Sequence, residues 1–537
     1  MIGADAIVKC LEKEGVTTLF GYPGVAICPF FNSILNTKIE SILVRSEQNA
    51  AHAASGYARV TGKVGVCVAT SGPGATNLLT GIATAYADSI PLVCITGQVD
   101  SKLLGSDVFQ EADITGAAES FVKYSYLIKD AADIPRIMKE AFHIASTGRK
   151  GPVLIDIPID VQNSPFAGFK YPEKADLRTY KPTVKGHAVQ IKKVGSELAR
   201  AKRPVILAGG GVILSGAQKD LHDFSHRFNI PVVSTMMGIS AVSHDDPLYF
   251  GMIGNNGRKC ANTAMQESDL LIVIGARIAD RAVSSPDLVA KDTVLIHIDV
   301  DPAEIGKNVG PTIPIVGDIK SIFGDLAKQD VQCDFDDWLS TLSSYRQNEK
   351  GRKSPRKNYV DPAVFITKLS GKMEDDAVYV ADVGQNQMWS CMYYKAKSGR
   401  FLTSGGMGTM GYSIPAAIGA KKANAKLQVV AVCGDGSFQM AMNELATMVE
   451  NNIPVKTVVF NNGYLGLVRE YQHNTYKAYS MVDLGNVPDL EKIAQAYNIP
   501  FYRLRNNTGM DRVLDDFLKE KGCALMECLL DPMDVVK

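Results

Sequence analysis

LQVVAVCGDGSF (residues 427–438) and VKTVVFNN (residues 455–462) are the two segments that decide the fold. Each contains a Val-rich apolar run that is short enough for a buried strand. Between them, residues 437–451 carry apolar side chains at helical spacing. A strand, a glycine turn, a helix and a second strand form a parallel crossover. The sequence therefore predicts a parallel α/β sheet, with Asp435 and Asn462 at the carboxyl ends of strands, where such sheets bind ligands.

The residues at these strand ends predict a magnesium site. Asp435 and Asn462 offer a carboxylate and an amide oxygen, and Gly434, Gly436 and Ser437 open a helix N-terminus beside them. Oxygen ligands and a helix N-terminus suit Mg²⁺ bridged to a diphosphate. The spacing resembles the GDG and NN signature of thiamine diphosphate (ThDP) enzymes. The alternative is a glycine turn followed by an ordinary Asn-Asn turn.

Length and composition narrow the class of protein. A chain of 537 residues is longer than a single hydrophobic core usually supports, and this length predicts about three domains. Lys plus Arg and Asp plus Glu both number 57, so no net charge points to nucleic acid or a membrane surface, and small-molecule partners are favoured. The N-terminus has an amphipathic pattern rather than a signal core, and no apolar run is long enough to span a membrane, so we expect a cytoplasmic protein. The ten cysteines include no C-x-x-C pair and are expected to be buried free thiols.

The chain is expected to divide into three α/β domains with doubly wound parallel sheets, at residues 1–165, 188–342 and 358–537. Strand candidates in the first two are TLFGY, SILVR, VGVCVAT, PLVCIT, PVLIDIP, PVILAG, PVVSTM, LLIVIGA and VLIHIDV. Residues 165–187 lack periodicity and are expected to be a linker. The basic run 346–357 is expected to be a second, solvated linker, because no aromatic residues interleave with its charges.

Glu47 is a candidate acid–base residue. It follows the strand SILVR and begins a helix of unusually small residues, 46–58, which must pack closely against something. A partly buried carboxyl has a raised pKa and can share a proton with a ring nitrogen, as the aminopyrimidine of ThDP requires. The alternative is that Glu47 only complements the helix N-terminus. This segment alone favours that simpler role.

Longer runs of the sequence resemble the catalytic subunit of acetohydroxyacid (acetolactate) synthase, a ThDP-dependent family. They extend over almost the whole chain: SEQNAAHAASGYAR, SGPGATNLLTGIATAYADSIPLVCITGQV, GSDVFQEADITG, TGRKGPVLIDIP, GARIADR, HIDVDPAEIGKN, SGGMGTMGYSIPAAIGA and GDGSFQMAMNELATMVENNIPVK. The resemblance implies a pyrimidine-binding first domain, a central FAD-type domain and a third domain that binds diphosphate and Mg²⁺.

The activity implied by the resemblance is decarboxylation of pyruvate and carboligation to a second 2-oxoacid. The product would be 2-acetolactate or 2-aceto-2-hydroxybutyrate, in branched-chain amino acid biosynthesis. A homodimer or homotetramer is implied, and a regulatory subunit is common in the family. The alternatives are a ThDP carboligase or decarboxylase with a different acceptor, a pyruvate oxidase type of enzyme, and a binding protein without activity. Retention of Glu47, Asp435, Asn462 and Arg277 argues against the last.

The resemblance also implies site residues. The family's cofactor-activating glutamate matches Glu47, and its Mg²⁺ ligands match Asp435, Asn462 and the carbonyl of Tyr464. The residue that wedges the cofactor into its bent form matches Met410, and the residues beside the reacting centre match Phe109 and Gln110. The arginine that holds the carboxylate of the second 2-oxoacid matches Arg277. Positions that contact a flavin without a net redox role match Arg149, Gly209, Gly210, Gly211, Met252, Gly275, Arg277, Asp299 and Asp318. From the residues alone, Gly209 to Gly211 lack the full dinucleotide spacing and suit a simple tight turn equally well.

Several positions depart from the family pattern. Those near the substrate are Val25, Ser46, Asp100, Ile159 and Tyr471, and those near the flavin are Ile253, Ile278 and Ala279. Tyrosine in place of tryptophan at Tyr471 leaves more room in the acceptor pocket, and valine in place of glycine at Val25 fills space beside the cofactor. The sequence therefore does not identify the acceptor substrate. The chain stops soon after residues 526–532, so the family's C-terminal tail is expected to be short or missing.

Overall fold

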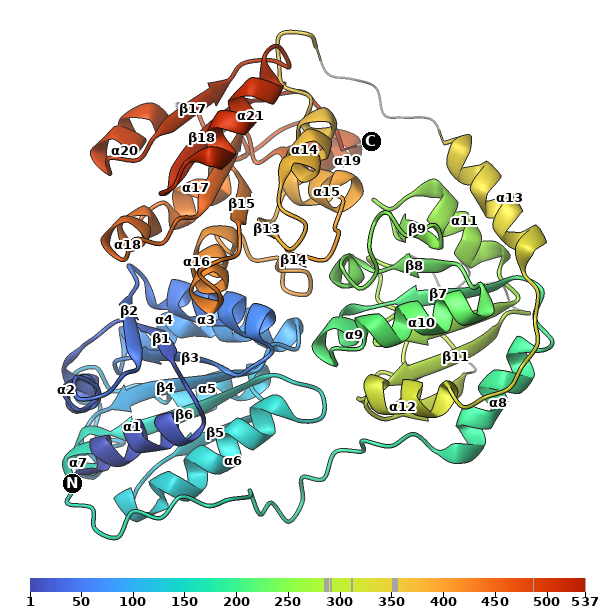
Figure 1. Ribbon diagram of the computed structural model, residues 1–537. Coiled ribbons are helices and arrows are strands. Elements are labelled where there is room, and N and C mark those ends of the chain that lie inside the picture. The colour runs from blue at the N-terminus through green and yellow to red at the C-terminus, as the bar shows by residue number, and fades with distance from the viewer. Residues whose placement is uncertain (284–288, 290–291, 311, 350–355, 486, 537) are drawn as a thin grey trace.

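Three six-stranded parallel sheets with helices on their faces succeed one another along the chain (Figure 1). The computed structural model describes residues 1–283, 289, 292–310, 312–349, 356–485 and 487–536. Within these residues every paired strand of the three sheets runs parallel to its neighbour. The predicted fold class is therefore confirmed.

The first sheet has the strand order β2-β1-β3-β4-β6-β5. Its strands are β1 Thr18–Gly21, β2 Glu40–Leu43, β3 Gly65–Ala69, β4 Leu92–Gln98, β5 Tyr124–Leu127 and β6 Pro152–Pro158, and its helices are α1 Gly3–Lys13, α2 Cys28–Ile34, α3 Glu47–Thr61, α4 Pro73–Ala87, α5 Ile114–Ala118, α6 Ile134–Ser146 and α7 Ile159–Asn163. The sequence pattern identified every strand except β5. That strand is a half-exposed edge without a buried apolar run.

The second sheet has the order β12-β11-β10-β7-β8-β9. Its strands are β7 Pro204–Ala208, β8 Val232–Ser234, β9 Tyr249–Met252, β10 Leu270–Ile274, β11 Val294–Asp299 and β12 Ile313–Val316, and its helices are α8 Ala188–Leu198, α9 Gly210–Leu214, α10 Gln218–Phe228, α11 Lys259–Glu267, α12 Ile319–Leu326 and α13 Asp336–Gln347. The strands β9 and β12, which the sequence pattern did not identify, are the two edges of the sheet.

The third sheet has the order β14-β13-β15-β16-β18-β17. Its strands are β13 Val378–Ala381, β14 Arg400–Leu402, β15 Val429–Gly434, β16 Lys456–Asn461, β17 Phe501–Leu504 and β18 Ala524–Leu529. Its helices are α14 Pro362–Lys372, α15 Gln385–Tyr393, α16 Ser413–Ala423, α17 Asp435–Ala441, α18 Glu444–Glu450, α19 Gly466–Tyr476, α20 Leu490–Ala496 and α21 Met510–Lys519. Because β15 and β16 are neighbours, with Gly434 opposite Phe460, the turns that follow them lie side by side.

The single helix expected over residues 437–451 is in fact two helices. The break falls at Met442 and Asn443, between α17 and α18. Asn443 Nδ2 donates to the carbonyl of Arg45 over 3.4 Å, and Glu444 Oε1 accepts from the Arg45 amide over 2.8 Å. The break thus aims two polar side chains at the first domain, a contact that helical spacing does not reveal.

Two segments connect the three sheets along the chain. No helix or strand lies between α7 and α8, and this stretch runs along the first domain to the middle one (Figure 1). Its aromatic residues Phe166, Phe169, Tyr171 and Tyr180 pack on the first domain's core. Helix α13 continues past residue 342, and residues 350–355 of the basic run lie outside the described part of the chain. The expected domain limits therefore remain a prediction.

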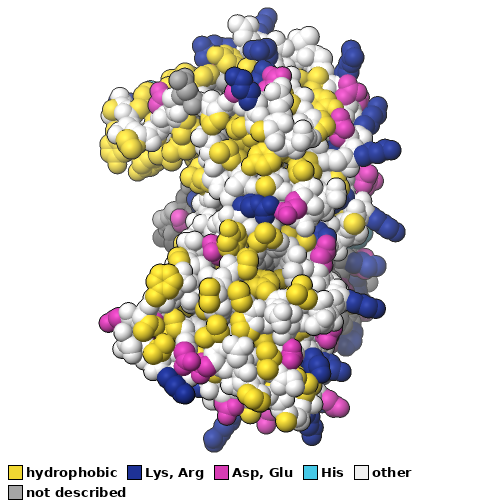
Figure 2. Space-filling view, turned by 90° about the vertical axis from the view of Figure 1, so that its left-hand side faces the viewer, with side chains coloured by type: hydrophobic (Ala, Val, Ile, Leu, Met, Phe, Trp, Pro, Cys, Tyr) yellow, Lys and Arg dark blue, Asp and Glu magenta, His cyan; other side chains and the backbone are white. Residues whose placement is uncertain are grey.

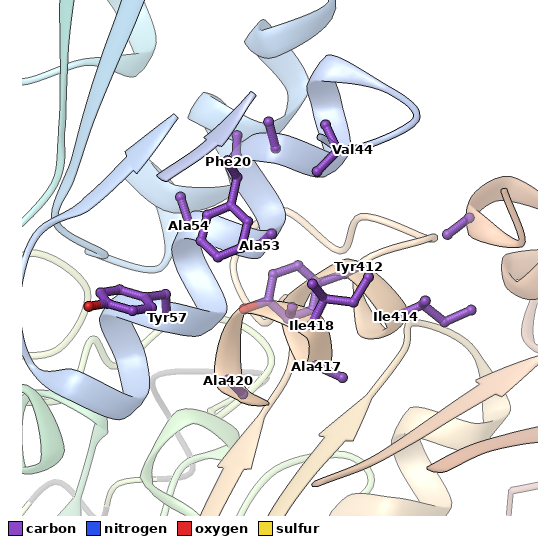
Figure 3. Close-up of a cluster of buried hydrophobic side chains, with 14 of the residues drawn as sticks. Phe20, Val44, Ala53, Ala54, Tyr57, Tyr412, Ile414, Ala417, Ile418 and Ala420 are labelled. Atoms are coloured by element: carbon purple, nitrogen blue, oxygen red, sulfur yellow. The ribbon is translucent and has the colours of Figure 1, made fainter. Parts of the chain in front are cut away.

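Helices α3 and α16 join the first domain to the third (Figure 3). A Cβ atom at Gly56 would lie 1.9 Å from the carbonyl oxygen of Ala416, and one at Gly419 would lie 1.8 Å from that of Ala53. Only glycine permits so close a contact between helix backbones. The small residues that follow Glu47 therefore have their partner in α16, and one hydrophobic core continues through both domains.

The ten cysteines are free, and eight of them are buried, in accordance with the sequence prediction. None of the helices in the described ranges combines the length and the apolar character needed to cross a membrane.

Candidate functional site

The Asp435 carboxylate lies buried where β15 ends and α17 begins. Its Oδ1 accepts a hydrogen bond from the Gly436 amide over 2.9 Å. Its Oδ2 accepts from the amides of Asn462 and Gly463 over 3.2 and 2.6 Å. Burial raises the pKa of Asp435 to about 6, although these backbone donors act in the opposite direction. The turns after β15 and β16 are thus held together by one carboxylate.

Asn462 and Tyr464 belong to the turn that the Asp435 carboxylate holds. Asn462 Nδ2 donates to Gln385 Oε1 over 3.1 Å, which fixes the orientation of the amide, and Asn462 Oδ1 accepts from the Tyr464 amide over 3.0 Å. Gln385 is a residue that the sequence reasoning missed. It begins α15 just after strand β13, so its position at the carboxyl edge of the same sheet was the available signal.

Met410 lies beside the same turn. A Cβ atom at Gly436 would lie 3.5 Å from Met410 Cε and 2.7 Å from Leu465 Cδ2. The loop that carries Met410 is held by the buried Asp382, which accepts from the amides of Gly411 and Ser413 over 2.9 and 2.7 Å. Burial raises the pKa of Asp382. Sequence reasoning also missed this aspartate, which directly follows the apolar strand VYVA.

Glu47 lies in a second group of residues, on the first domain. It begins α3 and is half-buried, and its Oε2 accepts from Asn77 Nδ2 of α4 over 3.0 Å. A Cβ atom at Gly74 would lie 3.3 Å from Glu47 Oε1 and 2.8 Å from the Thr70 methyl carbon. The carboxylate therefore lies against the first turn of α4, where glycine leaves it room.

Phe109 and Gln110 occupy the loop after β4, near the same helix terminus. A Cβ atom at Gly72 would lie 2.9 Å from Gln110 Cβ, and Gln110 has a left-handed backbone with φ of 61°. The Phe109 side chain is 88 % exposed. Among the described residues, no hydrogen bond joins Glu47 to Asp435, so the chain carries two groups of predicted site residues on separate domains.

A cavity of about 410 Å³ lies where the three domains meet. Eight of the nine positions predicted to contact a flavin line it: Arg149, Gly210, Gly211, Met252, Gly275, Arg277, Asp299 and Asp318. Gly209, the ninth, lies behind the wall, where a Cβ atom would be 2.1 Å from the carbonyl oxygen of Gly275. The first domain contributes Arg59 and Asp88 to the wall, and the third contributes Arg400.

Glycines shape the middle domain's side of this cavity. A Cβ atom at Gly211 would lie 2.7 Å from the Cα of Gly275, which itself has φ of 57°. The turns after β7 and β10 therefore approach each other closely and leave a smooth wall. The glycine triplet was expected to form either a dinucleotide site or a simple tight turn. In the structure it is a tight turn that opens onto the cavity and leads into the short helix α9.

Charged groups line the rest of the cavity. Arg149 crosses from the first domain, and its Nη1 donates to Asp301 Oδ2 over 3.1 Å and to Glu304 Oε1 over 2.9 Å. Burial raises the pKa of Asp299 to about 6. Asp318 accepts from Ser215 Oγ over 2.9 Å and from the Ser321 amide over 3.1 Å at the start of α12. The donor set suits a polar, partly anionic ligand with hydroxyl groups.

Comparison with known proteins gives one consistent result. Profiles of the thiamine pyrophosphate enzymes match the chain in three places: the N-terminal TPP binding domain at residues 1–117, the central domain at 191–326 and the C-terminal TPP binding domain at 382–528. The probable acetolactate synthase large subunit of Methanocaldococcus jannaschii is 44 % identical, over 100 % of this chain and 93 % of its own length. The acetolactate synthase large subunits of Haemophilus influenzae and Lactococcus lactis are each 43 % identical, over 92 % and 99 % of this chain and 88 % and 93 % of their own lengths.

The chain belongs to the acetolactate synthase family of thiamine pyrophosphate enzymes. The resemblance noted in the sequence is thereby confirmed. Some of the positions at which the chain departs from the family pattern lie on exposed surfaces, and others lie at or behind the cavity wall. Val25 and Tyr471 are 76 % and 61 % exposed, on the first and third domains. Asp100 caps a short turn by accepting from the Lys102 amide over 3.0 Å.

The departures near the cavity affect its wall unequally. Ile253 is buried and lines the cavity, and so does the smaller Ala279. Ile278 is buried in the core of the middle domain instead. Of the three departures in this region, two therefore change the cavity surface of this acetolactate synthase family member, and one is accommodated in the core.

Proposed function

We propose that the chain catalyses ThDP-dependent decarboxylation of pyruvate and joins the remaining two-carbon unit to a second 2-oxoacid. With pyruvate as both substrates, two molecules yield one 2-acetolactate and one CO₂. The observation that carries the proposal is the contact between the buried Asp435 carboxylate and the turn of Asn462, at the carboxyl edge of a sheet in a chain whose relatives are named acetolactate synthases. The Asp435, Asn462 and Tyr464 oxygens suit Mg²⁺, which prefers oxygen ligands and phosphate partners.

ThDP supplies the electron sink for decarboxylation when it is bound. The chain's own residues supply position and proton transfer. Gly434 leaves the edge of the third sheet open for a diphosphate, and Gly436 allows Leu465 to pack against the turn. Met410 presents an unbranched apolar side chain beside them. Glu47 presents its carboxyl group beside the first turn of α4, where it would exchange a proton with a pyrimidine ring nitrogen.

Arg277 is proposed to hold the carboxylate of the second 2-oxoacid, because a planar guanidinium binds a carboxylate through two parallel hydrogen bonds. Phe109 and Gln110 are proposed to border the reacting centre. The large exposed fraction of Phe109 agrees with a role that is completed only when another surface covers it. The exposed Val25 and Tyr471 would then adjust the space for the acceptor.

FAD is proposed to occupy the cavity where the three domains meet. The glycine turns after β7 and β10 and the side chains of Arg149, Asp299 and Asp318 would hold it. They fit such a group, because a smooth glycine wall admits a diphosphate backbone closely and the aspartates offer acceptors for hydroxyl groups. We infer a structural role for the flavin, since it would link all three domains.

A homodimer or larger homo-oligomer is proposed because the predicted site residues lie in two groups on separate domains. Exposed large hydrophobic side chains also gather on the first and third domains, and among those described Val189 is the only one within residues 188–342. Figure 2 shows one face of the molecule with hydrophobic side chains over much of its area and with lysines and arginines mainly around its margins. The relatives' description as large subunits supports a separate smaller partner. Cytoplasmic location stays a prediction.

The proposed function is tested by turnover of the purified chain with pyruvate, ThDP and Mg²⁺, together with an absorption spectrum. We expect 2-acetolactate as product, dependence on both added cofactors, and a flavin band that persists in the presence of pyruvate. A second reaction with 2-oxobutanoate added should yield 2-aceto-2-hydroxybutyrate.

The alternatives give different products in the same experiment. Formation of acetate with bleaching of the flavin under anaerobic conditions would identify an oxidase. Release of acetaldehyde, or products only with aldehyde acceptors, would identify a decarboxylase or a carboligase with another acceptor. Absence of pyruvate consumption with bound ThDP and Mg²⁺ would overturn the proposal.

A further inference from the structure

Two histidines stand one turn apart on helix α10 of the middle domain. His222 and His226 are separated by four residues and therefore lie on the same face of the helix. Their rings are stacked with centroids 4.1 Å apart. Both side chains are exposed in part, by 54 % and 37 %. Neither belongs to the cavity or to the residues around Asp435.

The Asp246 carboxylate faces both histidines from the turn that precedes β9. Its side chain is only 4 % exposed. The His226 Nε2 atom lies 3.1 and 3.0 Å from its two oxygens, and the His222 Nε2 atom lies 3.8 Å from Oδ2. One candidate ligand atom from each of the three residues can be chosen so that all lie within 4.8 Å of one another.

We propose that His222, His226 and Asp246 form a binding site for a divalent transition metal ion of the Zn²⁺ class. Ligand atoms about 2.0–2.2 Å from a tetrahedral ion lie roughly 3.3–3.6 Å from each other. The separations of 3.0 and 3.8 Å lie close to that range on either side. Small side-chain movements, in which the ion replaces the direct contact between His226 and Asp246, complete the site. Water takes the fourth position, because both histidines are open to solvent.

The surroundings orient these ligands as metal sites require. His222 Nδ1 lies 3.4 Å from Asp223 Oδ1, so its Nε2 atom is the one turned toward Asp246. Asp246 Oδ1 accepts from the Leu248 amide over 2.9 Å, which fixes the carboxylate. Partners of this kind set ring orientation and raise ligand basicity in metal sites. An isolated ion pair between His226 and Asp246 would not account for the approach of His222.

The donor atoms separate this site from the one at Asp435. Two imidazoles and one carboxylate favour Zn²⁺, Ni²⁺ or Cu²⁺, whereas the all-oxygen set around Asp435 favours Mg²⁺. A metal ion here would link α10 to the turn that leads into β9, whose Met252 lines the cavity between the domains. Binding to the folded chain alone then stabilises the middle domain by mass action.

The test uses the full chain without an affinity tag, saturated with ThDP and Mg²⁺. Zn²⁺ is titrated by calorimetry, and Co²⁺ is added in a parallel experiment to record the visible bands of a tetrahedral complex. We expect one strong site per chain and a rise in the melting temperature with Zn²⁺. His222→Gln and His226→Gln should each weaken binding by at least about tenfold. His187→Gln, at an exposed histidine directly before α8, should bind as the unmodified chain does.

His222→Gln is the decisive variant, because a half-exposed side chain contributes little to folding. Zn²⁺ affinity and Co²⁺ bands that persist unchanged in His222→Gln would overturn the site. So would the absence of a saturable Zn²⁺ site in the unmodified chain. Excess Mg²⁺ should not displace the bound Zn²⁺, and displacement at millimolar Mg²⁺ would also contradict the proposed ligand set.

Discussion

Glu47 illustrates how one carboxylate receives both a fixed position and room to act. Asn77 holds one oxygen, while Gly74 leaves space beside the other. Replacing Glu47 with glutamine preserves the size of the side chain and its contact with Asn77 but removes the proton-transfer group. We expect the variant to bind ThDP and to lose about 10²–10⁴-fold in turnover with pyruvate. Steady-state product formation and a ThDP titration measure the two effects.

Glu119→Gln provides the matched control for this variant, because Glu119 is an exposed carboxylate of the same domain. Its turnover should equal that of the unmodified chain. Turnover of Glu47→Gln at the unmodified rate would contradict the role of Glu47 as the proton-transfer group, while the family assignment would stand.

Asp435 is expected to control cofactor affinity rather than rate alone. In Asp435→Asn, the amide NH₂ replaces one of the two oxygens and faces the backbone N–H of Gly436, or those of Asn462 and Gly463, without an acceptor. The substitution also removes the negative charge that Mg²⁺ needs. We expect ThDP affinity at fixed Mg²⁺ to fall by at least about tenfold, since roughly 1.4 kcal/mol suffices for that change. Quenching of intrinsic fluorescence reports binding. Asp515→Asn, on the surface of the same domain, should bind ThDP normally, and normal binding by Asp435→Asn would refute the assignment.

The contact between helices α3 and α16 depends on two glycines with no space for a side chain. In Gly419→Ala the new Cβ atom would lie 1.8 Å from the carbonyl oxygen of Ala53, so the helices must separate. We expect a loss of about 1–3 kcal/mol or more, seen as a lower melting temperature. The control is Gly371→Ala in α14, where nothing lies within 4 Å of the added atom. Since alanine favours helix, this second variant should melt slightly higher, and a change of the same sign in both would contradict the packing argument.

Strands β4 and β6 carry three buried polar residues, Thr96, Gln98 and Asp156, that make the stability of the fold depend on pH. Thr96 Oγ1 and Gln98 Nε2 donate to Asp156 over 2.7 and 2.9 Å, yet burial raises the pKa of Asp156 to about 7. The folded state therefore binds a proton that the unfolded state releases near pH 4. This contribution to stability is fully present below that pH and is lost as the pH rises through about 7.

Asp156→Asn is expected to remove that pH dependence, because an amide stays neutral and keeps both contacts once the Thr96 hydroxyl accepts. The melting temperature of the unmodified chain should fall between pH 6 and 8.5 by more than that of the variant, in scans monitored by circular dichroism. Parallel curves for the two proteins would show that Asp156 ionises without cost. Gln98 also donates to the carbonyl of Ala112, so these polar residues support the loop of Phe109 and Gln110.

The central elements were predictable from sequence, and the edges were not. Strands such as β15 and β16 are buried on both faces, so their sequences contain uninterrupted apolar runs that predict a strand. The half-exposed β5 lacks that signal. The same contrast holds in the site: the GDG turn has a local pattern, while Asp382 and Gln385 act through contacts with residues distant in sequence. The break between α17 and α18 likewise depends on Arg45, in another domain.

At the scale of the whole molecule, the separation of the two groups of site residues leads to a prediction about assembly. Sedimentation equilibrium should give a mass at least twice the 58.0 kDa of one chain. If the site is completed between chains, specific activity should fall on dilution together with the oligomer fraction. A fully active species of single-chain mass would contradict this assembly and would require Glu47 and Asp435 to meet within one chain.

The core shared by α3 and α16 also sets an order of events during synthesis. The first domain emerges from the ribosome long before residues 412–423 exist, so the small-residue face of α3 has no partner while the middle domain is being translated. The middle domain has a largely separate core and can fold in that interval. Until α16 is made, the face of α3 that packs on it stays exposed in the nascent first domain. Exposed apolar surface of this kind is what chaperones bind. The first domain is therefore completed late, although it is made before the middle and third domains.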